Sequence, residues 1–563
     1  MTTSSIQLIG GVPTLTVNNQ PIPNIAYMTY YTHRAAYTDF TEIGFRLFSF
    51  PVFFGGRTIN PFSQIPPFKP GIFDQETPNF SIFDQDVRDI LAACPEAMIF
   101  PRVNLSLPLS WDEAHPEELC DTAPNGRLRT CFSSDLWAAE TKRLLKLFID
   151  HIKASDFCDH IVGYQLAGGT TEEWMSFDGK GSIGKRSREA FARYCTEHEL
   201  SGTQEEYYAF LSHMTAQRIL EFAHYIKEET AHQLVVGTFY GYTLECPNPT
   251  STHHALAEIL NSTDIDFICS PVSYMDLRPV GQDHPNMLPI DSVKFHGKLY
   301  FAETDTRTHL TGAPNDMPYY STGIWQGPPK EVTLEIMKMH FARMLTHGHA
   351  MWWFDMWGQW YADPDYMDFL CQSRAILADT LNKSRKSIAQ MAVFIDERAL
   401  SHCYDGGPHA SDKDFCYGIR KTLGLSGIPY DIYLIDDYST VSQNYRACIF
   451  LDTYRTDAVQ NAINRSSSFL IINKDNANIT TSELRAFAAD AGITLMADRD
   501  VVFYACESFL FLHAPVAGEY QITLPEGMTA LSMSEGEPTL SPISNVLTLE
   551  GKHSYLFGCK TTF

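Results

Sequence analysis

Short apolar runs alternate with longer amphipathic stretches from residue 25 to about residue 380. The runs have the length of buried strands, and the stretches between them have the period of helices. Eight strands are predicted, at 25–30, 44–50, 98–105, 161–167, 234–240, 267–272, 299–303 and 350–354. Helices are predicted between them, including 86–94, 135–154, 185–197, 205–230 and 330–345. Repeated strand–helix units predict a (β/α)8 TIM barrel, whose active site lies at the C-terminal ends of the strands.

The pattern changes near residues 382–386 and again near Val501. Strand-like runs at 391–395, 433–435, 448–451 and 469–472 alternate with helical stretches at 412–423 and 481–491, which predicts a small open α/β sheet of the flavodoxin-like kind. No G-x-G-x-x-G follows these strands, so a dinucleotide site is not expected. After Val501, alternating residues and Pro/Gly turns predict a C-terminal β-sandwich. The expected domains are 1–385, which opens with a short β lead-in at 1–22, then 386–500 and 501–563.

Acidic residues follow two strands of the predicted barrel. The seventh strand ends in Glu303, and a glycine-bearing turn after the fourth strand carries Glu172 and Glu173. Because the strand ends of one barrel share one face, these carboxyl groups are expected to meet across a pocket. Paired carboxyls of this kind cleave glycosidic bonds, with one as proton donor and the other as nucleophile or base.

The amino-acid composition limits the classes of ligand expected for such a pocket. Aromatic residues make up 13% of the chain and cluster at 27–31, 48–54, 239–240 and 352–361. Aromatic rings stack on the apolar faces of sugars, although about half of these rings are expected to serve only the core. The net charge is −25, from 67 acidic against 42 basic residues, which argues against nucleic acid or an anionic membrane as partner. A neutral or cationic partner fits better.

The remaining sequence signals predict a plain cytoplasmic protein without a metal or cofactor. The N-terminus lacks a basic stretch followed by an apolar one, and no 18-residue apolar run occurs. The 13 cysteines include no C-x-x-C pair and are expected to be free thiols. His347 and His349 precede the eighth strand, at the opposite face of the barrel, with no third ligand nearby. Asp178 and Lys180 are expected to be solvated loop residues.

Three segments together resemble the clan A retaining glycosidases. These segments are Gly163-Tyr164-Gln165-Leu166-Ala167-Gly168-Gly169-Thr170-Thr171-Glu172-Glu173-Trp174, Ala302-Glu303-Thr304-Asp305-Thr306-Arg307-Thr308-His309-Leu310 and Met351-Trp352-Trp353-Phe354-Asp355-Met356-Trp357-Gly358-Gln359-Trp360. The chain looks like the trimeric β-galactosidases of glycoside hydrolase family 42 and the family 164 β-mannosidases, over nearly its whole length. The resemblance implies a barrel, an α/β trimerisation domain and a C-terminal β domain. It also implies a homotrimer in which a neighbouring subunit walls each pocket.

The resemblance assigns the nucleophile to Glu303 and the acid/base to a Glu after the fourth strand. In the clan, Asn directly precedes the acid/base, whereas this chain has Thr171 followed by Glu172 and Glu173. Both glutamates remain candidates, and Glu172 is preferred because Thr171 could replace the missing Asn. That Asn commonly binds the sugar 2-hydroxyl, so its absence favours a sugar with an axial group there, such as mannose. The lack of a cysteine cluster like the family 42 zinc site points the same way.

The expected substrate-binding residues follow from their positions. Arg102 is expected to keep Glu303 ionised, because a nearby cation lowers the pKa of a carboxyl group, and Tyr274 resembles the clan tyrosine that donates to the nucleophile. The full expected set is Arg102, Asn104, Trp111, Tyr240, Tyr274, Trp353, Asp355 and Trp357. The sequence therefore predicts a retaining exo-β-glycosidase acting on oligosaccharides, a β-mannosidase first and a β-galactosidase as the alternative. A catalytically silent carbohydrate-binding barrel is the alternative from another class, because a fold alone does not establish activity.

Overall fold

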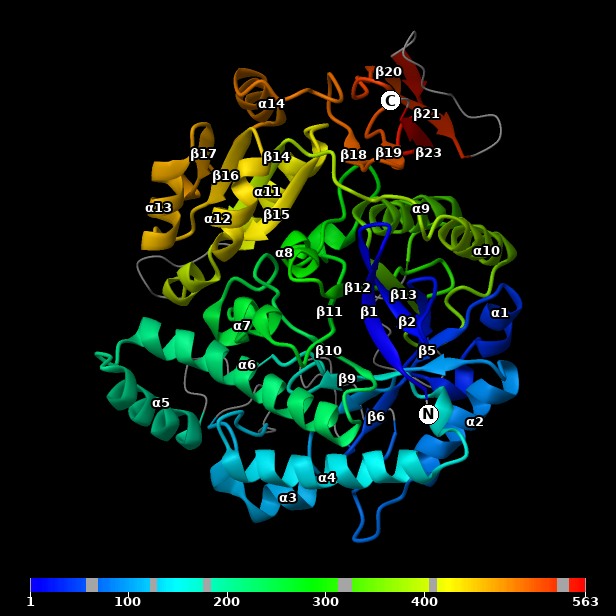
Figure 1. The fold of residues 1–563 in the computed structure, drawn as a ribbon, viewed down its shortest axis with the longest axis vertical. Helices are drawn as coiled ribbons and strands as arrows, with labels where there is room; N and C mark the ends of the chain where they lie inside the picture. The colour runs from blue at the N-terminus through cyan, green and yellow to red at the C-terminus, as the bar shows by residue number, and fades with distance from the viewer. Residues whose placement is uncertain are drawn as a thin grey trace.

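The structure is a computed structural model that describes residues 2–56, 69–121, 129–175, 184–311, 327–404, 413–533 and 546–561. Asp178 and Lys180 lie outside these residues. The described chain forms a barrel, an open α/β sheet and a C-terminal pair of antiparallel sheets, in chain order (Figure 1). The predicted fold class is confirmed for each of the three parts.

Eight parallel barrel strands are present where the sequence predicts them. The second and third are each split in two, around Phe50 and around Phe100 and Pro101. The sheet closes because the last strand pairs with the first, with Met351 opposite Ile25. The barrel strands are β4 (Ile25–Met28), β5 (Leu47–Ser49), β6 (Pro51–Phe53), β7 (Met98–Ile99), β8 (Arg102–Asn104), β9 (Gly163–Ala167), β10 (Val235–Phe239), β11 (Phe267–Pro271), β12 (Leu299–Thr304) and β13 (Ala350–Phe354).

Helices surround these strands, which are therefore buried on both faces and read as continuous apolar runs. The long helix α6 begins at a capping box, in which Thr203 and Glu206 exchange hydrogen bonds. The barrel helices are α1 (Tyr37–Glu42), α2 (Ser81–Ala93), α3 (Leu109–Ala114), α4 (Asp135–Ala154), α5 (Lys185–His198), α6 (Gln204–Glu229), α7 (Leu256–Asn261), α8 (Ile290–Phe295), α9 (Lys330–His347) and α10 (Pro364–Asp379).

Aromatic rings fill the interior of the barrel, and the first strands of the chain cover the N-terminal end of the barrel. Phe301 packs against Phe267 at 5.5 Å and against Trp352 at 5.4 Å between ring centroids. The predicted β lead-in is an antiparallel sheet of β1 (Ser4–Ile9), β2 (Val12–Val17) and β3 (Gln20–Pro21). Ile6 and Leu15 of this sheet contact the same aromatic layer. The N-terminal end of the barrel is thereby closed, which leaves the C-terminal strand ends for a site.

The second part is a parallel sheet in the order β15-β14-β16-β17. Its strands are β14 (Met391–Ile395), β15 (Tyr430–Leu434), β16 (Ala447–Leu451) and β17 (Phe469–Ile472), with helices α11 (Lys413–Leu425), α12 (Tyr438–Val441), α13 (Asp457–Arg465) and α14 (Thr481–Asp490). The third part pairs β18 (Val502–Ala505), β19 (Phe509–His513), β23 (Ser554–Thr561) and β21 (Met528–Ser532) in one sheet, and β20 (Gly518–Gln521) with β22 (Val546–Leu549) in another. Side chains from both of these sheets form one core, as in a sandwich.

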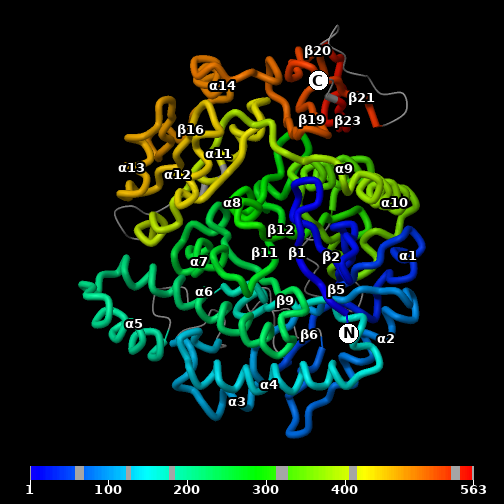
Figure 2. The backbone as a smooth tube through the Cα atoms, viewed as in Figure 1, coloured from blue at the N-terminus to red at the C-terminus, as the bar shows by residue number. Residues whose placement is uncertain are grey.

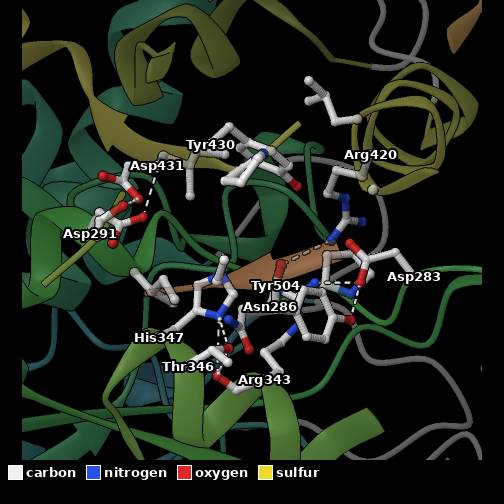
Figure 3. A pocket seen from close by; sticks show the side chains of 18 of the residues that line it. Asp283, Asn286, Asp291, Arg343, Thr346, His347, Arg420, Tyr430, Asp431 and Tyr504 are labelled. Carbon is white, nitrogen blue, oxygen red and sulfur yellow. Dashed lines mark hydrogen bonds and ion pairs between the residues drawn. The ribbon is translucent and has the colours of Figure 1, made fainter. Parts of the chain in front are cut away.

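The three parts follow one another along the chain (Figure 2), and residues from all three line a cavity of about 50 Å³ (Figure 3). Arg343 of α9 pairs there with Asp283, which also accepts a hydrogen bond from Tyr504 of β18. Arg420 of α11 donates to Glu245 of the barrel at 2.9 Å. These groups are buried, and the later domains are joined to the barrel by the Tyr504–Asp283 hydrogen bond and the Arg420–Glu245 ion pair.

Candidate active site

Glu303 lies near the C-terminal end of β12, where its side chain points into the barrel with Phe301. It is buried, and its Oε2 accepts a hydrogen bond from Arg102 Nη2 at 2.5 Å and another from Trp352 Nε1 at 3.2 Å. Burial raises the pKa of Glu303, and the Arg102 guanidinium opposes that shift by stabilising the carboxylate. The strand end thus presents a carboxyl group held in one orientation by two donors.

Arg102 is fixed from several strands. Its Nη1 donates to the Tyr30 hydroxyl at 2.8 Å and its Nε to Gln165 Oε1 at 3.3 Å. The guanidinium lies 4.5 Å from the centroid of the Phe239 ring, a favourable cation–π geometry. The predicted position of Arg102 beside Glu303 is therefore found in the structure.

Glu172 is completely buried beside Arg102. Its side chain is 0% exposed, and its nearest polar neighbours besides Arg102 are Asn104 and Tyr30, which favour its ionised form. Arg102 Nη1 lies 3.9 Å from Glu172 Oε2, yet burial dominates and raises the pKa of Glu172 to about 7. The backbone is left-handed at Thr171, Glu172 and Trp174, with φ of 59°, 66° and 60°. Non-glycine residues adopt this conformation at a cost, and such strain concentrates at functional sites.

Glu173 lies in a different environment from its neighbour, because it is partly exposed and hydrogen-bonded. Tyr242 donates to its Oε1 at 2.9 Å, and Thr171 donates to its Oε2 at 2.8 Å. Burial raises the pKa of Glu173 to about 8, and the negative charge of Glu303 adds to the rise. A carboxyl group with this pKa holds a proton at neutral pH and can act as a general acid.

His253 holds the backbone of this segment. Its Nδ1 accepts from the Tyr242 N–H at 3.4 Å, so its Nε2 carries the proton and donates to the Glu173 carbonyl at 2.7 Å. Burial lowers the pKa of His253 to about 3, which keeps the ring neutral. Tyr242 and His253 were missed by the sequence reasoning, and neither lies in a motif that could have revealed it.

Two residues expected to bind sugar at the eighth strand do not face the carboxyl groups. Asp355 is fully buried and accepts from the Tyr27 hydroxyl at 2.8 Å and from the N–H groups of Gln359 and Trp360 at 3.0 and 2.7 Å. Its oxygens are used inside the loop, so the prediction that it grips a sugar hydroxyl is wrong. Trp353 points outward, 6.3 Å from the ring of Phe369 on α10, and cannot form the predicted platform.

Two expected tyrosines also have other partners. Tyr240 is buried, and its hydroxyl donates to the backbone carbonyls of Ser212 and Thr252 at 3.0 and 2.8 Å, so it is structural. Tyr274 donates to Asp305 Oδ2 at 3.1 Å, whereas the expected acceptor was Glu303. Its ring lies 4.6 Å from the Arg278 guanidinium, which pairs with the same Asp305. Tyr274 therefore supports the residue that lies two positions after Glu303.

The last three residues of the predicted substrate-binding set are Asn104, Trp357 and Trp111. Asn104 ends β8, where its Oδ1 accepts from the Ser106 N–H at 2.9 Å and its amide favours the charged form of Glu172. Trp357 packs 6.1 Å from Tyr30, the partner of Arg102. Trp111 lies in α3 and packs on the ring of His115 at 4.7 Å.

Trp352, in place of Trp353, reaches the nucleophile candidate. The strict alternation of side chains along β13 sends Trp352 and Phe354 inward, 5.7 and 5.5 Å from the Arg102 guanidinium, and Trp353 outward. Knowing which residues of β13 face the barrel axis would have identified Trp352. Every residue of β13 is apolar, so the sequence does not show which face points inward.

The described ranges hold neither a metal-binding cluster nor a membrane-spanning helix. No group of three His, Cys, Asp or Glu there has the arrangement of a metal site. No described helix is long and apolar enough to cross a bilayer. The ring nitrogens of His347 and His349 make hydrogen bonds to the backbone carbonyls of Arg343 and Ala350, at 3.1 and 2.8 Å.

Comparison with known proteins supports the fold described above. No family model matches the sequence, and no curated protein matches it. Among solved structures, a β-galactosidase from Marinomonas ef1 superposes with a TM-score of 0.61 at 11% identity, over 95% of this chain and 99% of that one. A β-galactosidase from Rahnella sp. R3 gives 0.61 at 11%, over 96% and 98%. An exo-carrageenase of family GH42 from Bacteroides ovatus gives 0.57 at 12%, over 100% and 85%. At these identities the likeness establishes the fold, which this chain shares with GH42 glycoside hydrolases along nearly its whole length.

Proposed function

We propose that this protein is a retaining β-glycosidase in which Glu303 is the nucleophile and Glu173 the acid/base. One observation carries the proposal. Glu303 is buried against Arg102, and at the same barrel face Glu173 has a pKa raised to about 8, partly by the charge of Glu303. Double displacement requires one carboxylate and one protonated carboxyl: the Arg102 contact favours the ionised form of Glu303, and the raised pKa of Glu173 favours its protonated form. The shared fold with glycoside hydrolases supports the same reading.

The residues have defined roles in the two steps. The Glu303 carboxylate attacks the anomeric carbon while protonated Glu173 gives its proton to the departing glycosidic oxygen, and a glycosyl–Glu303 ester forms. Ionised Glu173 then removes a proton from water as that water attacks the anomeric carbon and Glu303 is released. Arg102 and Trp352 hold Glu303 in place through both steps.

Glu173 is preferred here over Glu172, the first choice from sequence. A general acid must reach the leaving oxygen, and Glu172 has no exposed surface through which to do so. Glu173 is partly exposed and has donors on both oxygens. Glu172 then occupies the position before the acid/base, where the resembling enzymes have Asn.

For the sugar, we propose a terminal β-mannoside, with exo action on short oligosaccharides. The Asn that commonly binds the sugar 2-hydroxyl in the enzymes this chain resembles is missing here, which supports an altered contact near that hydroxyl. β-Galactosidase is the second candidate, and the fold likeness to enzymes described as β-galactosidases favours it. A homotrimer built through the α/β domain is proposed from resemblance alone.

Hydrolysis of p-nitrophenyl β-mannoside and β-galactoside by the wild type and three variants tests the proposal. Glu303→Gln is expected to lose activity by roughly 10⁴-fold, because the nucleophile is gone. Glu173→Ala is expected to lose roughly 10²- to 10⁴-fold and to regain turnover in azide, which replaces the water that Glu173 activates. Glu172→Ala is expected to show no azide rescue.

The outcomes separate the alternatives. The anomer released first, followed by NMR, is β for a retaining enzyme acting on a β-glycoside. Azide rescue of Glu172→Ala alone would return the acid/base role to Glu172. Full activity of Glu303→Gln would exclude the mechanism, and absence of turnover on any β-glycoside would leave the silent binding barrel as the better account. The faster of the two substrates names the sugar.

A further inference from the structure

A buried carboxyl group of the α/β domain reaches across to a barrel helix. Glu397 begins the 3-10 helix η8 (Glu397–His402), directly after β14, and is 4% exposed. Its Oε2 accepts from the N–H of Leu256 at 2.6 Å and its Oε1 from the N–H of Ala257 at 2.9 Å. These N–H groups open α7 and have no acceptor within their own helix. The second domain therefore caps a helix of the first.

The residues just before α7 bind the segment that carries Glu173. Thr252 Oγ1 donates to the Trp174 carbonyl at 3.3 Å, and His253 Nε2 donates to the Glu173 carbonyl at 2.7 Å. Two consecutive residues thus hold two consecutive carbonyls. Because the backbone at Trp174 is in the strained left-handed region, this segment depends on such outside contacts to keep its shape.

Tyr242 connects His253 to the carboxyl group of Glu173. The Tyr242 N–H donates to His253 Nδ1, and the Tyr242 hydroxyl donates to Glu173 Oε1 at 2.9 Å. The His253 ring also stacks on the Tyr240 ring, at 4.9 Å between centroids. His253 is therefore tied both to the backbone of Glu173 and to the donor that orients its carboxyl group.

We propose that Glu397 is a positioning residue for the acid/base, acting through the start of α7, His253 and Tyr242. The inference rests on the proposed function of Glu173. Proton transfer in a transition state needs the donor within hydrogen-bond reach of the leaving oxygen, and small displacements slow it strongly. The α/β domain, which supplies no reacting group, would then set the geometry of the proton donor.

The same domain offers a matched control. Asp437 is also buried, and it holds another barrel helix, α8. Its Oδ2 accepts from Ser292 Oγ at 2.6 Å and its Oδ1 from His296 Nε2 at 2.9 Å. These contacts resemble those of Glu397 in burial and in joining the two domains, but they do not lead to Glu173. Asp437→Asn therefore reports the general cost of loosening the domain contact.

The test uses leaving groups that differ in their need for a proton. Dinitrophenolate departs from the sugar unaided, whereas phenolate needs the acid. For Glu397→Gln and Glu397→Ala, kcat/KM is expected to fall roughly 10- to 100-fold on the phenyl β-glycoside and less than about 3-fold on the 2,4-dinitrophenyl β-glycoside. Asp437→Asn is expected to change both substrates by the same factor. Equal losses on both substrates in the Glu397 variants would overturn the inference.

Amide hydrogen exchange gives a readout that needs no substrate. Glu397→Gln is expected to speed exchange in residues 252–258 and also in 168–175, compared with wild type and Asp437→Asn. Faster exchange in 252–258 with no change in 168–175 would show that α7 is not coupled to the Glu173 segment, and would overturn the inference. A wild type without glycosidase activity would instead contradict the proposed function, while the exchange result would still decide whether the two segments are coupled.

Discussion

Glu172 and Glu173 are adjacent in the chain, yet the protein places them in opposite environments. Glu172 is enclosed beside the Arg102 guanidinium, with Asn104 and Tyr30 close enough to favour its ionised form. Glu173 is partly exposed and is held by Tyr242 and Thr171. Left-handed backbone at Thr171 and Glu172 turns the two side chains apart. Environment, and not residue type, therefore distinguishes the two carboxyl groups.

The pH dependence of kcat/KM should report Glu173. Its pKa is raised to about 8, first by burial and then by the charge of Glu303, so activity is expected to fall as the pH rises through about 8 and Glu173 loses its proton. The Tyr242 hydroxyl stabilises the ionised form, so Tyr242→Phe is expected to raise this pKa. A hydrogen bond worth about 1 kcal/mol corresponds to a shift of roughly 0.7 pH unit upward.

Tyr240→Phe is the control for this shift, because it also removes a buried phenol hydroxyl but one that bonds only to the carbonyls of Ser212 and Thr252. In Tyr240→Phe, kcat/KM is expected to fall at the same high pH as in the wild type. If the fall in kcat/KM moves to lower pH in Tyr242→Phe, the Tyr242 hydroxyl does not stabilise the ionised form of the acid/base carboxyl group.

At the scale of elements, the strand ends were predictable but the faces of the strands were not. Apolar runs located β12 and β13, and a carboxyl at a strand end singled out Glu303. In a parallel barrel both faces of a strand are buried, so the runs carry no alternation from which to tell Trp352 from Trp353. Tyr240 directly follows β10, and its hydroxyl bonds to backbone carbonyls, while Tyr242, two residues further on, donates to Glu173.

Partners brought together from distant elements were also beyond the sequence. The position of Arg102 beside Glu303 could be expected, since both lie at strand ends of one barrel. His253 and Glu397 could not, because their contacts depend on how a loop and a second domain fold against the strand-four segment. Asp355 was misread because an acidic residue after a strand can serve its own loop as well as a ligand.

The loop after β13 should depend on Asp355. Asp355→Ala leaves the Tyr27 hydroxyl and the N–H groups of Gln359 and Trp360 without their acceptor. Buried donors left unpaired cost about 1 kcal/mol or more each, so the free energy of unfolding of the barrel is expected to fall by about 3 kcal/mol. Urea unfolding followed by tryptophan fluorescence measures the loss. Asp355→Asn keeps one acceptor oxygen and should lose less, and an equal stability of all three proteins would contradict the structural role.

At the scale of the whole molecule, a buried ion pair inside the barrel also receives a side chain of the C-terminal sheet. Asp283 of the barrel receives both Arg343 of α9 and Tyr504 of the C-terminal sheet, and the Arg343 guanidinium lies 4.4 Å from the Tyr504 ring (Figure 3). Removing one partner of a buried pair leaves the other charge without compensation, which costs more than the pair itself contributes. The junction should therefore be sensitive to loss of Asp283.

Asp283→Ala is expected to lower the free energy of unfolding by roughly 3–5 kcal/mol, since Arg343 stays buried without its anion. The exposed ion pair between Lys421 of α11 and Asp276 of the barrel joins domains in the same region, with side chains 35% and 45% exposed. Solvent screens such a pair, so Asp276→Ala should cost less than about 1 kcal/mol. Denaturant unfolding of the two variants compares these losses. Equal losses would mean that the buried contacts of Asp283 with Arg343 and Tyr504 stabilise this junction no more than an exposed ion pair does.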